Sequence, residues 1–177
     1  AELHEAGWVF SDLKSDNVLV HDYGRVELVD YGGMTAIGRG VRQFTEIYDR
    51  GYWMAGSRTA DAAYDWFAFA VLWIHAVDGR RLMQMTRLRL PQDRGVEDLM
   101  KLVRSHPQLR TMEGWMERAF RGQFRDSRDA LQAWRQTHRQ KDAAKFGKSH
   151  VPAWMAGLLV VSVALCLSFA AVWLFQK

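Results

Sequence analysis

The sequence predicts an α+β fold that is mainly α-helical, contains one small β-hairpin and is followed by a single transmembrane helix. Two short apolar runs, residues 18–20 and 26–29, flank a turn that contains Gly24, and this pattern is typical of a hairpin. Residues 62–77 are almost wholly apolar, as expected for a helix buried inside a domain. Residues 153–175 carry no charged side chain and are long enough to cross a bilayer.

Amphipathic helices are predicted for the second half of the domain. Apolar residues recur there at intervals of three and four, in residues 96–103, 111–120 and 127–138. Residues 32–61, between the hairpin and the buried helix, show weak periodicity and are predicted to form a long loop of the kind that often carries function. The chain has 177 residues, which is enough for one domain with a short appendage.

Composition narrows the classes of function. One Cys cannot form a disulfide framework or a Cys-based metal site, and the six His residues lack metal-ligand spacing, so we expect no zinc. Residues 1–79 carry six Lys or Arg and 12 Asp or Glu, whereas residues 80–148 carry 17 and eight. This split predicts an acidic region that carries the function, followed by a basic surface that binds an anionic partner. The alternative is that the basic half is an Arg-rich surface exposed only to solvent.

Two motifs flank the predicted hairpin. Residues 10–17 read FSDLKSDN and residues 30–32 read DYG. The pair resembles the catalytic loop and the metal-binding loop of Hanks-type protein kinases, which also flank a short hairpin. Residues 51–57 are similar to the end of an activation segment, and Asp65 looks like the start of the family's central buried helix. The resemblance covers about residues 1–138 and implies a protein-kinase-like C-terminal lobe.

The resemblance implies roles for four residues. Asp12 would orient the substrate hydroxyl and accept its proton, while Lys14 would stabilise charge on the transferred phosphoryl group. Asn17 and Asp30 would hold Mg²⁺ ions that bridge the phosphates of ATP. Lys at the position of Lys14 is found in kinases that act on Ser and Thr of proteins, so the expected substrates are proteins.

Two further residues would support this site. Gly32 would permit the tight backbone turn that directs Asp30 inward. Asp65 would accept hydrogen bonds from backbone N–H groups of the catalytic loop, although a helix N-cap would equally suit an Asp.

The sequence departs from the family pattern before and after the catalytic Asp. Phe10 and Ser11 replace the family's His and Arg, so no evident cation would receive a phosphate on Thr35 or Thr45. The A-P-E motif is replaced by Ala, Gly and Ser at residues 55–57.

The lost Glu of the A-P-E motif would leave a buried Arg without its usual partner. Arg121 or Arg125 could be that unpaired Arg. Residues 50–52 also lack the Thr usually found there, which leaves the phosphoacceptor pocket undefined.

Domain boundaries follow from these assignments. We expect a kinase C-terminal lobe at residues 1–139, a basic juxtamembrane linker at 140–151 and a transmembrane helix at 152–175. The Gly-rich loop and strand Lys of the N-lobe are expected to be missing, and the fragment alone is expected to be inactive. Positive charges before the span place the kinase domain in the cytoplasm of a single-pass protein of the cell membrane.

The favoured function is a membrane-anchored bacterial protein Ser/Thr kinase that uses ATP and Mg²⁺. Its expected partners are protein substrates, the membrane and the missing N-lobe. One alternative is a pseudokinase-type interaction module docked at the membrane. Another is a module that binds DNA or anionic lipid through a basic set of residues on the last helix and linker. This basic set comprises Arg128, Arg135, Arg139, Lys141, Lys145 and Lys148.

Overall fold

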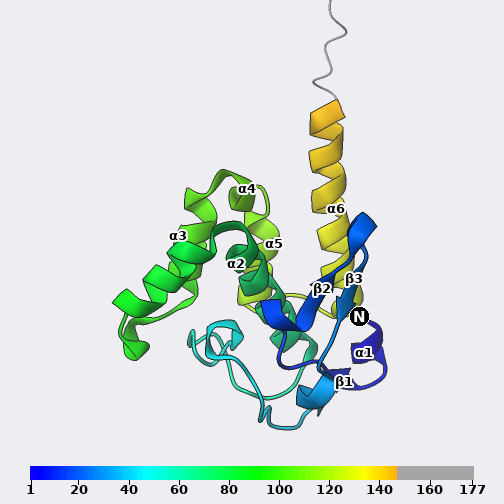
Figure 1. Ribbon diagram of the computed structural model, residues 1–177, viewed down its shortest axis with the longest axis vertical. Coiled ribbons are helices and arrows are strands. Elements are labelled where there is room, and N and C mark those ends of the chain that lie inside the picture. The colour runs from blue at the N-terminus through cyan, green and yellow to red at the C-terminus, as the bar shows by residue number, and fades with distance from the viewer. Residues whose placement is uncertain (147–177) are drawn as a thin grey trace, which may run out of the picture. The chain divides into compact units, whose positions relative to one another are not determined.

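The computed structural model describes the backbone of residues 1–146 and the side chains of residues 1–139 (Figure 1). Residues 1–137 form one compact unit. In chain order, the helices and strands of the described residues are α1 (Glu2–Glu5), β1 (Trp8–Val9), β2 (Val18–Val20), β3 (Val26–Leu28), β4 (Thr35–Ala36), α2 (Ala62–Leu88), α3 (Val96–Ser105), α4 (Pro107–Arg110), α5 (Glu113–Phe120) and α6 (Ser127–Phe146).

Two short antiparallel strand pairs occur in the described part of the chain. β2 and β3 form the predicted hairpin, with Val18 opposite Leu28. β1 and β4 also pair, with Val9 opposite Thr35, although a long stretch of chain separates them. The hairpin prediction is therefore confirmed. The β1–β4 pair was not predicted because two-residue strands are too short to show a periodic pattern.

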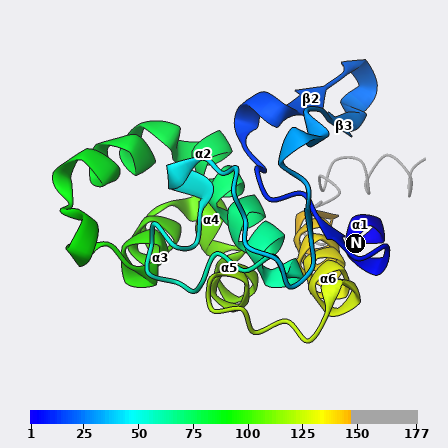
Figure 2. The same ribbon diagram turned by 90° about the horizontal axis from the view of Figure 1, so that it is seen from below.

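Helix α2 is the central element of the unit. Its N-cap is Asp61, whose carboxylate accepts a hydrogen bond from the backbone N–H of Tyr64 at 2.8 Å. Buried side chains recur along it at helical spacing, and α3, α4 and α5 pack against it (Figure 2). The predicted helix ended at Val77, but α2 continues through a kink at Asp78 and ends at Leu88.

The hydrophobic core joins α2 to the later helices and to the loop that carries Asp12. Trp115 of α5 makes an edge-to-face contact with Phe69 of α2, with ring centroids 5.8 Å apart. Phe10 and Leu13, on either side of Asp12, belong to the same buried cluster. Each fully buried side chain of this size contributes about 1.5–3 kcal/mol. Packing of Phe10 and Leu13 in the core therefore holds the loop that carries Asp12 against α2.

The prediction of a transmembrane helix requires correction. Among residues 1–146, no helix combines the length and the apolar character needed to span a bilayer. The longest, α2, carries Arg80, Arg81 and Arg87 in its second half. This finding contradicts the fold class that included a transmembrane helix, and also the single-pass location in the cell membrane. The segment predicted to span, 152–175, itself lies outside the described residues.

Helix α6 is also longer than predicted. The sequence predicted a helix at residues 127–138 and a linker from residue 140, but α6 extends to Phe146. The rest of the predicted linker lies outside the described residues.

Candidate active site

Asp12 is the centre of the candidate site. It is only 3% exposed, and each of its carboxylate oxygens accepts a hydrogen bond. Lys14 Nζ donates to Oδ2 at 2.8 Å, and Thr45 Oγ1 donates to Oδ1 at 2.9 Å. The side-chain amide of Asn17 donates to the backbone carbonyl of Asp12 at 2.9 Å. The structure thus brings together three predicted site residues and adds Thr45.

The electrostatics of this group keep Lys14 charged. Its hydrogen bond to Asp12 raises the pKa of Lys14 above the ordinary value of 10.5, and this outweighs burial, which lowers it. The negative charges of Asp12, Asp30 and Asp16 raise this pKa further. A cation therefore stays beside the Asp12 carboxylate throughout the neutral range.

Thr45 was missed as a site residue by sequence reasoning. The sequence motifs indicate it only as a phosphorylation site, yet its hydroxyl donates to Asp12. Thr45 directly precedes a 3₁₀ turn at Glu46–Tyr48. No local signal could reveal this contact, because 33 residues separate the two side chains in the chain.

Asp65 holds the backbone that precedes Asp12. Its Oδ2 accepts from the N–H of Phe10 at 2.8 Å, and its Oδ1 accepts from the N–H of Ser11 at 2.9 Å. Ser11 has a left-handed backbone with φ of 71°, a conformation that non-Gly residues rarely adopt. The helix cap is Asp61 rather than Asp65. The carboxylate of Asp65 therefore fixes a strained turn directly before the candidate base.

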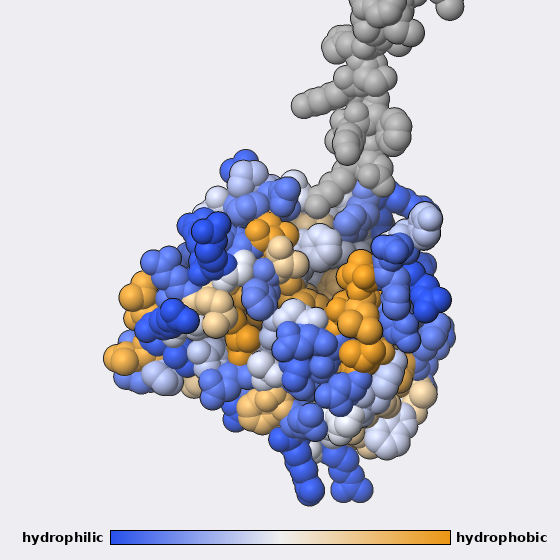
Figure 3. Space-filling model, in the orientation of Figure 1, coloured by the Kyte–Doolittle hydropathy of each residue, from blue (hydrophilic) through white to orange (hydrophobic). Residues whose placement is uncertain are grey.

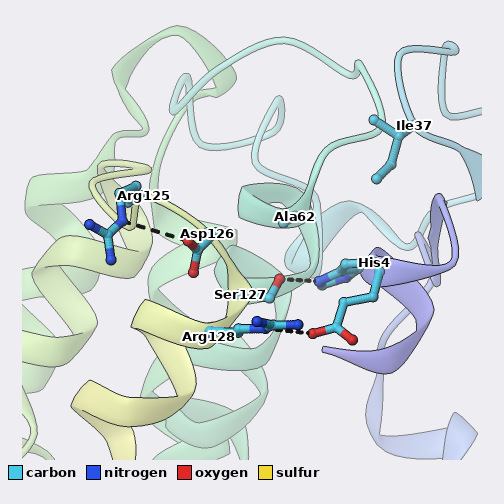
Figure 4. Close-up of a pocket in the computed structure, with 8 residues that line it drawn as sticks. His4, Ile37, Ala62, Arg125, Asp126, Ser127 and Arg128 are labelled. Carbon is cyan, nitrogen blue, oxygen red and sulfur yellow. Dashed lines mark hydrogen bonds and ion pairs between the residues drawn. The ribbon is translucent and has the colours of Figure 1, made fainter.

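His4 links the Asp65 carboxylate to Ser127 at the start of α6. Its Nε2 lies 2.8 Å from Asp65 Oδ2, and its Nδ1 lies 2.5 Å from Ser127 Oγ. Trp66 Nε1 donates to Ser127 Oγ at 3.3 Å. Because the Asp65 carboxylate only accepts, His4 Nε2–H donates to it, and in the neutral ring Nδ1 then accepts from the Ser127 hydroxyl. His4 and Ser127 line a cavity of about 400 Å³. Figure 4 shows the hydrogen bond between these two side chains. The sequence around His4 contains no motif that predicts its hydrogen bonds to Asp65 and Ser127.

Asn17 and Asp30 are brought to the same end of the hairpin. The N–H of Val29 donates to the carbonyl of Asn17 at 3.0 Å, one residue before Asp30. Asp30 is exposed and has a left-handed backbone, and its Oδ1 accepts from the N–H of Gly32 at 3.3 Å. A Cβ on Gly32 would lie 3.2 Å from that Oδ1, and the left-handed residue of this turn is Asp30 rather than Gly32.

The side-chain oxygens of Asn17 and Asp30 could supply part of the coordination shell of a Mg²⁺ ion. Because Nδ2 of Asn17 donates to the Asp12 carbonyl, Oδ1 of Asn17 remains available as an oxygen ligand, and Asp30 offers its carboxylate. Within residues 1–139, no three His, Cys, Asp or Glu side chains gather into a metal cluster. Mg²⁺ commonly takes one or two protein oxygens and completes its shell with phosphate and water. The residues present therefore fit a metal that arrives with a nucleotide.

The two motifs also touch each other. The ring of Phe10 packs edge-to-face on that of Tyr31, with centroids 5.6 Å apart. Phe10, where the resemblance expected a His, thus links the two loops.

Arg121 and Arg125, the two candidates for an unpaired Arg, both have carboxylate partners. Arg121 pairs with Glu117 and Glu97, and Arg125 pairs with Asp126, so neither is the unpaired Arg that was predicted.

Two ion pairs hold the long loop at residues 32–61 in place. Arg50 makes two hydrogen bonds at 2.8 Å to Asp61, the cap of α2. Arg58 donates to the buried carboxylate of Asp49 at 2.8 Å. Because Arg50 is itself buried, this ion pair fixes the loop firmly to the start of α2.

The predicted basic set is only partly described. Arg128 pairs with Glu5 at 2.9 Å, whereas Arg135 and Arg139 lie exposed on α6. Lys141 and Lys145 belong to the α6 backbone, and Lys148 lies outside the described residues. Binding of DNA or anionic lipid by this set stays a prediction.

Comparisons with known proteins agree with the geometry. The chain is 32% identical to the serine/threonine-protein kinase YabT of Bacillus subtilis (strain 168) over 148 residues, which are 81% of this chain and 42% of that protein. It is 28% identical to the serine/threonine-protein kinase PAK 4 of Mus musculus over 131 residues, which are 67% of this chain and 21% of that protein. No protein-family model matches.

A shorter match is to the serine/threonine-protein kinase SMU1 of Mycosarcoma maydis, 32% identical over 44% of this chain and 11% of that protein. The chain therefore spans less than half the length of each of these relatives. At these modest identities, the matches support a kinase-like relationship for the chain.

Proposed function

We propose that this chain contributes the phosphoryl-transfer site of a protein Ser/Thr kinase, which moves the γ-phosphate of ATP to Ser and Thr hydroxyls of proteins. The observation that carries the proposal is the buried Asp12 carboxylate, held between Lys14 and Thr45. A carboxylate fixed in this way can orient a substrate hydroxyl and accept its proton.

The other residues of the site have complementary roles. Lys14 carries the positive charge that offsets negative charge as it develops on the transferred group. Asn17 and Asp30 would hold Mg²⁺, which neutralises the nucleotide phosphates when bound. Asp65 keeps Phe10 and Ser11 in place, so the orientation of Asp12 is set before substrate arrives.

Apolar surface beside this site supports nucleotide binding. The hairpin leaves Val20 71% exposed and Val26 60% exposed, and Figure 3 shows apolar surface over the hairpin. Aliphatic surface on the hairpin that directly follows Asn17 suits the face of a purine ring. We also propose that the chain needs further protein to cover this surface, because it spans only 42% of its Bacillus relative, and that it does not turn over ATP alone.

The test is transfer of labelled phosphate from ATP to Ser- and Thr-containing protein by the full protein that contains this chain. Asp12→Asn is expected to reduce the rate by about 10²–10⁴-fold, because it removes the proton acceptor. Asp16→Asn is the matched control, since Asp16 is an exposed carboxylate of the same loop. Equal rates for Asp12→Asn and the parent would refute the assignment, and absence of any transfer would favour the interaction module.

A further inference from the structure

A cavity of about 730 Å³ lies next to the candidate site around Asp12. The proposed phosphoryl transfer assigns no role to it. Residues 32–36 and residues 39–43 line this cavity. Two of the lining side chains, Arg39 and Arg42, are exposed cations.

These two arginines differ from the other cations of the acidic half. Residues 1–79, all of which the structure describes, contain six Lys or Arg. Four of them form ion pairs with carboxylates, and Arg39 and Arg42 are the two that do not. The ion-paired four are Lys14, Arg25, Arg50 and Arg58.

The backbone that carries the arginines is fixed. Gly38 turns the chain with φ of 83°, and its N–H donates to the carbonyl of Ala60 at 2.8 Å. The N–H of Val41 donates to the carbonyl of Arg58 at 2.8 Å, and the carbonyl of Arg39 accepts from Ala60 at 2.7 Å. A fixed backbone reduces the ordering that a ligand would otherwise require.

The cavity adjoins the candidate base. Gly33, which lines the cavity, is buried, and a Cβ placed on it would lie 3.2 Å from Cβ of Asp12 and 3.7 Å from Cβ of Gln43. Two residues beyond Gln43, Thr45 donates to the Asp12 carboxylate. A group bound in the cavity would therefore lie close to the loop that carries Asp12.

We propose that Arg39 and Arg42 form a binding site for an anionic side chain of the protein substrate, either a carboxylate or a phosphoryl group near the acceptor Ser or Thr. This inference rests on the proposed function, because it assumes that a protein segment lies at Asp12. Two planar guanidinium groups suit such oxygens, which they bind by charge-assisted hydrogen bonds. The site would select substrates with an acidic residue close to the acceptor.

The first experiment measures peptide binding to the 177-residue chain by fluorescence anisotropy. The peptides share one Ser and differ at a single scanned position, which holds Glu, phosphoserine or Ala. We expect the Glu or phosphoserine peptide to bind about tenfold tighter than the Ala peptide at one narrow range of positions, equivalent to about 1.4 kcal/mol. Rising salt should reduce that advantage. A preference confined to phosphoserine would assign the site to phosphorylated substrates.

The variants make this test specific. Arg39→Ala with Arg42→Ala should abolish the preference, whereas Arg80→Ala with Arg87→Ala removes the same charge from the exposed second half of α2 and should retain it. Arg39→Glu with Arg42→Glu should favour a Lys peptide instead. Equal binding of all peptides, or equal loss in both double Ala variants, overturns the proposal.

Kinetics of the full protein separate this proposal from the proposed function. Phosphoryl transfer with the same kcat/KM for acidic and neutral peptides overturns the anion site and leaves the kinase assignment standing. Acid-selective binding without any phosphoryl transfer overturns the kinase assignment and leaves the anion site supported.

Discussion

Hydrogen bonds to both oxygens of the Asp12 carboxylate hold it in one orientation. Carboxylates on loops are usually solvated, yet both oxygens of Asp12 are bound, one by a cation and one by a hydroxyl. Lys14 and Thr45 thereby fix the rotation of the carboxylate. The resemblance of the two sequence motifs pointed to Asp12 and Lys14, but it could not point to Thr45, which reaches Asp12 only through the fold of the long loop.

Loss of the Thr45 hydroxyl is expected to lower kcat more than it alters KM. A hydrogen bond to a charged group contributes about 1.5–3 kcal/mol, so Thr45→Val should reduce kcat by about tenfold or more. Thr45→Ser keeps the hydroxyl and should retain most activity, which makes it the matched control. Steady-state kinetics of the full protein provide the measurement, and equal loss in both variants would contradict a role for the hydroxyl.

The ion pair of Lys14 has a defined pH dependence. Because the pKa of Lys14 is raised in the folded chain, its stabilisation is complete below the unfolded value of about 10.4 and is lost as pH rises through the folded value, above 10.5. The stability difference between the parent and Lys14→Met should thus stay constant from neutral pH to about pH 10 and shrink above it. Denaturant unfolding at several pH values measures this difference, and a difference that shrinks near neutrality would contradict the assignment.

At the scale of elements, α2 connects the core to the site. Its apolar sequence made it predictable, and the turn between the apolar runs made the β2–β3 hairpin predictable. The kink at Asp78 and the β1–β4 pair depend on tertiary contacts that no local pattern encodes. The same applies to the chain of hydrogen bonds from Ser127 through His4 to Asp65, which joins α6, α1 and α2.

Removal of the Asp65 carboxylate should destabilise the unit. Asp65→Ala leaves the buried N–H groups of Phe10 and Ser11 without their acceptor, at a cost of about 2–5 kcal/mol. Asp16→Ala removes an exposed carboxylate and should change stability by less than about 0.5 kcal/mol. Denaturant unfolding of the chain provides the comparison. Similar midpoints for the two variants would show that the Asp65 carboxylate adds little to stability.

For the molecule as a whole, the distribution of charge bears on nucleotide binding. The first 79 residues hold all four proposed catalytic and metal-binding residues and carry twice as many acidic as basic side chains. Most of their cations are already paired with carboxylates. An anionic nucleotide is therefore expected to depend on a divalent cation in this half.

The Mg²⁺ dependence of single-turnover phosphoryl transfer by the full protein tests the central claim most directly, because Asp12 and Asp30 are proposed to act on different groups. Asp30→Asn weakens a metal ligand, so its defect should shrink as the Mg²⁺ concentration rises. Asp12→Asn removes the proton acceptor, so its defect of about 10²–10⁴-fold should persist at every Mg²⁺ concentration. Defects that respond identically to Mg²⁺, or rates equal to that of the parent in both variants, would contradict the account.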